Sequence, residues 1–468
     1  MKKILLLVLI STSATYAMVN QTNDISPIGV NPSLPFTVKI EVEDFFIPGG
    51  IQSGVSAQCG QYYLFMAGRT NGLHGFDNND DNFPIQQQNT NIFVINICTK
   101  SVYVRSLYDA RAGLTSAQID TLSVTSPQFY QSGNTLYITG GYGVDTGTGN
   151  FSTKDTLTAI DVSGLINWVM HPESPLVAFQ YIRQISNPVF QVTGGHMSQV
   201  GQCPTLLIFG QNFQGFYNTN SNGIYTQQVR RFNIVDDGTC LGVKVLPPTQ
   251  PSPNYRRRDL NVVPIIKINN SNKKIPAFVA FSGVFTLNSG IWTVPVEINT
   301  DGTTSMANPN SASTFKQGIN NYASAHAELL ACNGDMYSIL FGGLTYIYYK
   351  NGQMMLDEGI PFTNQIGVIR RSKEGNYTQY ILPEEYPVLT SKQSNPGNRL
   401  FFGTGAKFIP APNIPAFSNG VLDLSKIKQS TVIGHIVGGI QSTLINTNVI
   451  TDSAASPYIF KVTLIPLR

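Results

Sequence analysis

Two polar segments carry most of the side chains that could bind a ligand in this chain of 468 residues. Segment 68–84 contains Arg69, Asn71 and His74, and segment 210–217 mixes side-chain amides with aromatic rings. A guanidinium and amides form directional hydrogen bonds, while aromatic faces stack on sugar rings or on apolar side chains. The two segments therefore favour a glycan or a peptide as the ligand.

Three consecutive arginines and an aspartate occupy positions 256–259. Arg257 or Arg258 could hold a carboxylate in a bidentate fork, and Asp259 could orient a guanidinium or exchange a proton with a sugar. A structural ion pair between repeats is the alternative. Arg258 with Asp259 is accordingly the catalytic candidate. The expected ligand-binding residues are Arg69, Asn71, His74, Tyr142, Gln211, Phe213, Tyr217, Arg257, Arg258 and Asp259.

Other reactive side chains match no common catalytic or metal-binding pattern. Asp77, Asp80 and Asp81 could offer oxygen ligands to calcium, although their spacing differs from that of an EF-hand. His196 and His326 fall in predicted inner strands and are interpreted as channel histidines rather than copper ligands. No Gly-x-Ser-x-Gly element occurs. We therefore expect no cofactor or metal, with calcium as the alternative, and a binding protein rather than an enzyme.

The charge of the chain and its N-terminal segment restrict the expected partners and the expected location of the protein. The chain has 30 basic and 27 acidic residues and no basic stripe beyond 256–258, so a nucleic acid is not an expected partner. Residues 1–17 combine a basic start, an apolar run and a small-residue cleavage site, which is typical of a secretory signal. The apolar run is too short to span a bilayer, and no later run is long enough. We expect a secreted or periplasmic bacterial protein.

A β-rich apolar phrase that ends in glycine recurs six times. The phrases are Tyr62–Gly68, Leu136–Gly141, Leu206–Gly210, Phe278–Gly283, Tyr337–Gly343 and Ile433–Gly439. Their final glycines lie about 60 to 96 residues apart, which leaves room for several strands per unit. Each phrase is predicted to be the second strand, B, of a unit with strands A to D. Four-stranded units repeated around an axis form a β-propeller.

The two ends of the chain are expected to close this ring. Segment 36–45 alternates in a strand pattern, and segment 458–465 ends the last unit as its strand C. We expect the two to pair, so that residues 36–468 form one six-bladed all-β domain after a linker at 18–35.

The spacing before the last phrase is the longest. Segment 395–405 is interpreted as strand A of the sixth blade, and segment 408–415 as part of an insertion after it. A seventh blade is the alternative.

All five cysteines follow the predicted signal. Cys59 and Cys203 each precede a strand B, and Cys98 and Cys240 each follow a strand C. Because strands B and C are antiparallel neighbours, the start of one adjoins the end of the other, at a strand separation of about 5 Å that a disulfide can span. We expect Cys59–Cys98 and Cys203–Cys240 disulfides, with Cys332 free.

The repeat resembles that of kelch propellers. Gly140-Gly141 ends a strand B and Trp168 follows the next strand C, while Gly342-Gly343 and Gly438-Gly439 repeat the diglycine. The chain is also similar to exported bacterial kelch-repeat proteins. The resemblance implies that the B–C and D–A loops share one face around the channel mouth and bind the ligand there.

These observations predict a monomeric, exported binding propeller whose partner is a glycan or an extracellular protein. A kelch-type propeller that isomerises sialic acid is known, so the resemblance implies a mutarotase-like carbohydrate isomerase, or a lyase, as the alternative. Arg258 and Asp259 would then carry the chemistry. A structural component of a surface assembly is the third interpretation.

Overall fold

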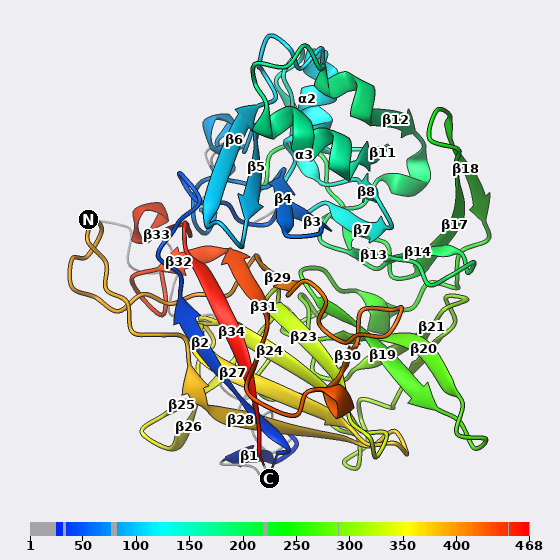
Figure 1. Cartoon of the computed structure of the whole chain (residues 1–468). Helices are drawn as coiled ribbons and strands as arrows, with labels where there is room; N and C mark the ends of the chain where they lie inside the picture. The colour runs from blue at the N-terminus through cyan, green and yellow to red at the C-terminus, as the bar shows by residue number, and fades with distance from the viewer. Residues whose placement is uncertain are drawn as a thin grey trace, which may run out of the picture.

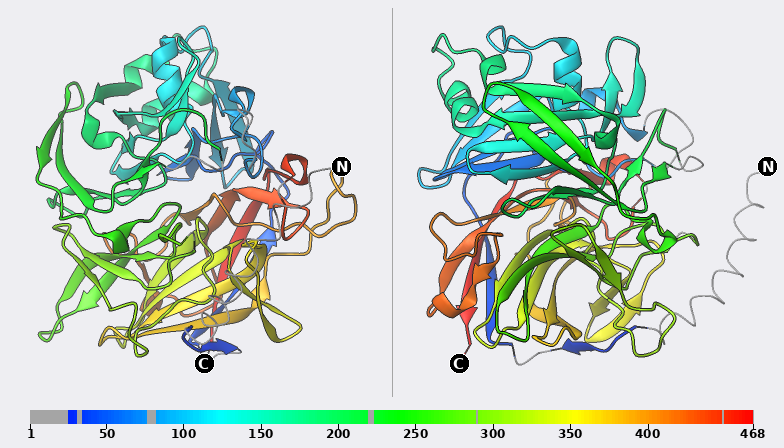
Figure 2. Two further views of the ribbon diagram at one scale, coloured as in Figure 1. Left: turned by 180° about the vertical axis from the view of Figure 1, so that it is seen from behind. Right: turned by 90° about the vertical axis from the view of Figure 1, so that its right-hand side faces the viewer.

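The protein is an all-β propeller, as the sequence predicts. In the computed structural model, 46% of the residues lie in strands and 8% in helices. Figures 1 and 2 show how these strands are arranged. The structure describes residues 25–30, 34–75, 82–218, 223–288, 290–447 and 449–467. The expected signal peptide (1–17) and the expected calcium ligands Asp77, Asp80 and Asp81 lie outside the described residues.

Each glycine-ended phrase forms the second strand of a sheet. These strands are β4 (Tyr62–Met66), β8 (Thr135–Thr139), β14 (Thr205–Ile208), β20 (Lys274–Phe281), β24 (Met336–Leu344) and β31 (Thr431–Gly438). All residues of β14 and β24 are buried. Neighbouring sheets cover both faces of these strands, so a continuous apolar run replaces the alternating pattern of a half-exposed strand.

The remaining strands complete each sheet in antiparallel order. The first strands are β3 (Val55–Cys59), β7 (Gln128–Ser132), β13 (His196–Ser198), β19 (Asn261–Ile268), β23 (Ala325–Leu330) and β29 (Ala406–Pro410). The third strands are β5 (Asn91–Asn96), β11 (Thr156–Asp161), β17 (Val229–Asp236), β21 (Val296–Asn299), β27 (Phe362–Arg371) and β34 (Ile459–Pro466). The outer strands are β6 (Ser101–Ser106), β12 (Ile182–Ser186), β18 (Leu241–Leu246), β22 (Thr304–Met306), β28 (Tyr377–Glu385) and β2 (Phe36–Val42).

The expected closure by the two ends of the chain is confirmed. Strand β2 pairs antiparallel with β34, from Phe36 opposite Pro466 to Val42 opposite Phe460. Figure 1 shows the two strands side by side, β2 in blue and β34 in red. The pairing covers a sheet edge that would otherwise be exposed.

The number of blades differs from the expected six or seven: five are counted. One sheet differs from the others in its connectivity. In five sheets, strands A to D all come from one continuous segment of the chain. The sheet β2-β34-β31-β29 instead joins the N-terminal strand β2 to three strands near the C-terminus. No seventh sheet of four strands occurs among the described residues.

Several local predictions need correction or addition. Strand A of the last sheet is β29 (Ala406–Pro410), not segment 395–405, and the insertion that follows contributes β30 (Leu422–Asp423) beside β23. Strand β1 (Ile28–Val30), inside the expected linker, pairs with β28. Two helices also cover the outside of the first sheets, α2 (Ser116–Leu122) and α3 (Val162–Met170).

The expected disulfides are absent, and all five cysteines are free thiols. Cys59 ends β3, and β4 separates it from β5, so two strand spacings of about 5 Å lie between Cys59 and the turn that holds Cys98. That span exceeds the Cα separation of about 7 Å that a disulfide accepts. In the third sheet, Thr205 pairs with Phe232, and β17 then continues to Asp236. This extension places Cys240 beyond the level of Cys203.

Main-chain hydrogen bonds link six inner residues around the channel. We call these residues the belt: Ser53, Ser126, Gly194, Asp259, Ala323 and Gly405. Around the ring, the N–H of each belt residue donates to the carbonyl oxygen of the belt residue before it at 2.7–3.1 Å. The exception lies between Asp259 and Ala323, where the Asn261 side chain instead donates to Asn321 O and accepts from Ser324 N. All six have positive φ, between 49° and 71°. The belt fixes how closely the first strands approach the axis.

Candidate functional site

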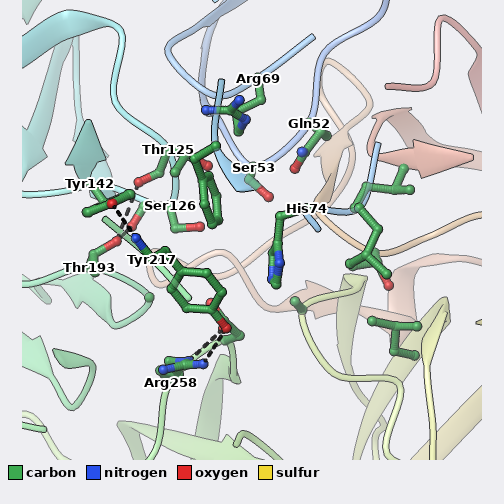
Figure 3. Close-up of a pocket in the computed structure, with 18 of the residues that line it drawn as sticks. Gln52, Ser53, Arg69, His74, Thr125, Ser126, Tyr142, Thr193, Tyr217 and Arg258 are labelled. Carbon is green, nitrogen blue, oxygen red and sulfur yellow. Dashed lines mark hydrogen bonds and ion pairs between the residues drawn. The ribbon is translucent and has the colours of Figure 1, made fainter. Parts of the chain in front are cut away.

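A cavity of about 140 Å³, here called the upper cavity, opens on one side of the belt (Figure 3). The same pairing of two residues recurs in several sheets and forms its walls. The residue before a belt residue pairs with the residue after a strand-B glycine, as in Gln52 with Arg69, Thr125 with Tyr142 and Thr193 with Gln211. At Gly68 a Cβ would clash with the Gln52 carbonyl oxygen, so glycine is needed for this close approach.

Arg258 presents a guanidinium to the upper cavity and is only 7% exposed. Its Nη1 donates to Gln211 Oε1 at 2.9 Å, and its Nη2 approaches the Tyr217 hydroxyl at 3.4 Å. Its Nε lies 3.4 Å from Asp259 Oδ2. Two of these three contacts are long, so an incoming carboxylate could displace them at low cost.

Arg69 is the second cation of the upper cavity. Its Nε donates to Asn71 Oδ1 and its Nη2 to Pro84 O, both at 2.8 Å, and its guanidinium lies 5.0 Å from the centre of the Phe83 ring. Burial lowers the pKa of Arg69 to about 10, so the group is charged at neutral pH. Asn71 therefore orients Arg69 rather than lining the cavity itself.

Aromatic rings form the wall between the two arginines. The His74 ring stacks on Phe83 at 4.9 Å and meets Tyr217 edge to face at 4.8 Å. In Figure 3 His74 and Tyr217 both project into the space above Arg258. Burial, and then the charges of Arg258 and Arg69, lower the pKa of His74 to about 4, so its imidazole is neutral at pH 7. The wall offers apolar stacking surface without a further charge.

Asp259 is the one acidic side chain among the described residues that line the upper cavity. Burial raises its pKa, and Arg258 opposes that shift. Its side chain is still 35% exposed. The upper cavity thus holds two guanidiniums and one carboxylate, a net positive charge.

A second opening of about 430 Å³ adjoins the upper cavity and shares His74, Tyr217, Arg258, Asp259 and Tyr322 with it. Its far wall is mainly apolar and includes Val284, Phe285, Ile360, Phe362 and Ile445. The combined space is polar and cationic on one side and apolar on the other. A ligand with one acidic group and a less polar body would match both walls.

The structure brings eight of the ten expected ligand-binding residues to the upper cavity: Arg69, His74, Tyr142, Gln211, Phe213, Tyr217, Arg258 and Asp259. Asn71 stands behind Arg69. Arg257 points away and is fully buried, with Nη2 donating to Val294 O at 2.8 Å and its guanidinium 4.7 Å from the Trp292 ring. It is a structural residue.

Sequence reasoning missed several lining residues. They are Gln52, Ser53, Thr125, Ser126, Thr193, Tyr322, Leu344, Thr404 and Ile440. Leu344 and Ile440 directly follow strand-B glycines, as Arg69, Tyr142 and Gln211 do, so the repeat itself marks them. The others lie just before strand A, where no motif distinguishes them.

Comparison with known proteins supplies no family. No family model and no curated protein matches the chain. Among solved structures, that of YjhT is 12% identical, with a TM-score of 0.46 over 90% of this chain and 98% of that one. A streptogramin B lyase structure is 10% identical, with a TM-score of 0.32 over 92% and 98%.

The described residues contain neither a membrane-spanning helix nor a cluster of metal-ligating side chains. No helix there is long and apolar enough to cross a membrane. No group of three or more His, Cys, Asp or Glu side chains in the same part of the chain is placed to hold a metal ion.

Proposed function

We propose that the upper cavity binds an acidic sugar residue of a glycan, and that the protein is a binding propeller. The observation that carries this proposal is the pair of buried guanidiniums, Arg69 and Arg258, beside the aromatic wall of His74 and Tyr217. With Asp259 as the one lining acid among the described residues, the pair retains a positive charge for a ligand carboxylate.

The rest of the upper cavity supports a sugar ring next to that carboxylate. Gln211 and Thr193 belong to the lining and offer hydrogen-bonding groups to ring hydroxyls. Tyr217 and Phe83 provide aromatic faces on which the less polar side of a sugar stacks. An extracellular protein that carries an exposed acidic side chain is an alternative partner for the same residues.

A glycan array with matched pairs tests the proposal. Each acidic glycan, sialylated or uronate-bearing, is printed beside its neutral counterpart. We expect binding to acidic members only, and its loss in Arg258→Gln. Arg111→Gln, at an exposed position away from the cavity, is the matched control and should bind like wild type. Equal binding to neutral and acidic members would contradict the proposal.

Isomerisation of the bound sugar is the second candidate function, and Asp259 is the observation that favours it. Its carboxyl group faces the cavity, its pKa is raised by burial, and Arg258 lies beside it. A raised pKa brings a carboxyl group closer to the pH at which it can act as a general acid or base. Exchange spectroscopy on a free acidic sugar tests this: faster anomer interconversion that is lost in Asp259→Asn supports catalysis, and the uncatalysed rate supports a binding module.

The same proposal includes a sixth kelch-type blade and export of the protein. The sheet β2-β34-β31-β29 contributes Gly405 to the belt, as each other large sheet contributes one residue, which supports counting it as a blade. Export rests on the sequence of residues 1–17. Cell fractionation of the full chain and of a chain lacking residues 2–17 tests it, with export expected for the full chain alone.

A further inference from the structure

A second cavity, of about 270 Å³, lies on the other side of the belt and is here called the lower cavity. It shares Ser53, Ser126, Gly194, Asp259 and Ala323 with the upper cavity, so the belt is the boundary between the two. First strands of the sheets supply the rest of its wall. The proposed glycan site does not use this space.

Lys407, on β29, is the notable cation of the lower cavity. Its Nζ makes no hydrogen bond or ion pair with any described residue, and it lies 5.1 Å from the centre of the Phe129 ring. Burial lowers the pKa of Lys407 to about 8, with no carboxylate opposing the shift. A largely desolvated ammonium group without a counter-ion is costly, and a bound anion offsets that cost.

Two buried polar atoms of the same cavity also lack a partner among the described residues. They are Oγ of Ser324, which is 5% exposed, and Oε1 of Gln128, which is 1% exposed. Their residues are fixed, because Ser324 N donates to Asn261 Oδ1 and Gln128 Nε2 donates to Ser126 O. The wall of the cavity that Lys407 lines thus also contains an unsatisfied hydroxyl and an unsatisfied amide oxygen.

The other titratable groups of the lower cavity limit the charge that it accepts. His326 is paired with Glu328, Nδ1 to Oε1 at 2.8 Å, and His196 Nε2 lies 2.9 Å from Ser198 Oγ. Burial, then the charges of His326 and Lys407, lower the pKa of His196 to about 3, so its ring is neutral at pH 7. With one unpaired cation and Asp259 at the belt, a monoanion fits better than a dianion.

We propose that the lower cavity binds a small hydroxy monocarboxylate. Its carboxylate lies between Lys407 Nζ and the Ser324 hydroxyl, and its hydroxyl donates to Gln128 Oε1. Apolar lining from Phe129, Leu260 and other residues of the first strands receives the carbon chain. The binding is independent of the glycan site above the belt.

Titration calorimetry with lactate as the probe tests the proposal, at pH 7 and at constant ionic strength in chloride. We expect saturable binding at one site, roughly tenfold weaker in Lys407→Met, as expected for loss of a charge-assisted hydrogen bond. Lys244→Met, at an exposed lysine of β18, should leave the affinity unchanged. Unchanged affinity in Lys407→Met, or no saturation by lactate, would overturn the proposal.

Two comparison probes and one measurement on the native chain complete the test. Propionate lacks the hydroxyl and should bind more weakly than lactate, and malonate, a dianion, should not compete. Lactate should also protect Lys407 from acylation by an activated acetate ester, read out by peptide mass spectrometry, while Lys244 stays reactive. Equal labelling of Lys407 with and without lactate would overturn the assignment even if the substituted protein did not fold.

Discussion

The hydroxyl of Tyr142 accepts a hydrogen bond from the backbone N–H of Tyr217 at 3.2 Å and donates to Gly215 O at 2.8 Å. A side chain that directly follows strand B of the second sheet thus holds the loop that follows strand B of the third. Because that loop carries Tyr217, the aromatic wall of the upper cavity is positioned before any ligand arrives.

Removing this hydroxyl should weaken binding more than folding. We predict that Tyr142→Phe lowers glycan affinity about three- to tenfold, since each such hydrogen bond contributes about 0.5–1.5 kcal/mol. The melting temperature should change little. Tyr108→Phe, at a tyrosine that is 59% exposed, is the matched control. A large fall in melting temperature at unchanged affinity would show that Tyr142 has only a structural role.

Adjacent arginines should have opposite effects. Arg257 is fully buried and donates to Val294 O and Ser282 O, so we predict that Arg257→Met lowers the free energy of unfolding by about 2–4 kcal/mol and leaves the affinity of the folded fraction intact. Arg258→Met should instead lower the glycan affinity and leave the free energy of unfolding nearly unchanged. Denaturant unfolding and glycan binding on the same samples measure both. A shared phenotype would contradict the separation of roles.

The pairing of β2 with β34 should govern solubility and cooperativity. A chain that begins at residue 44 lacks β2 and exposes the edge of β34, so we predict aggregation or loss of a single cooperative transition. A chain that begins at residue 34 retains β2 and is the control. Deleting 458–468 should have the same effect as losing β2. An unchanged transition in the chain that begins at residue 44 would refute closure by β2.

The cysteines should titrate as free thiols. We predict five reactive thiols in the denatured, unreduced protein and a melting temperature that reductant does not change, because no pair is bonded. A thiol-reagent titration with and without prior reduction measures the number. A count of one thiol would instead favour the two disulfides expected from the sequence.

Buried histidines should make the fold sensitive to acid. Burial lowers the pKa of His435 to about 4, against the opposing effect of Glu43, from an unfolded value of about 6.5. The unfolded chain therefore binds the proton first, so this contribution to stability is complete above pH 6.5 and is lost as the pH falls towards 4. We predict that His435→Gln reduces the fall in unfolding free energy between pH 7 and pH 4.5. His171→Gln, at an exposed histidine, should leave it unchanged.

Elements marked by the repeat were predictable from sequence, and elements set by register were not. The glycine phrases located β4, β8, β14, β20, β24 and β31, because apolar runs buried on both faces are visible in the residues. Arg69, Tyr142 and Gln211 were found because they lie in or beside those phrases. Gln52 and Thr125 carry no signal, since only tertiary pairing brings them opposite Arg69 and Tyr142.

The errors have the same physical origin. The disulfide prediction assumed that strands B and C end level, whereas β17 extends four residues past the partner of Thr205. Segment 395–405 contains a short apolar run at 400–402, yet β29 begins at Ala406, directly after the belt residue Gly405. In both cases the decisive quantity is the offset between strands, which local composition does not encode.

The pairing that joins β2 to β34 also sets an order of events during synthesis. The ribosome makes β2 before any other large strand and β34 after all five of the other large sheets, so the first strand remains without its partner until the ring is otherwise complete. A contact of such sequence separation forms late and slowly. The nascent chain is therefore an open arc until β34 has been made and has paired with β2.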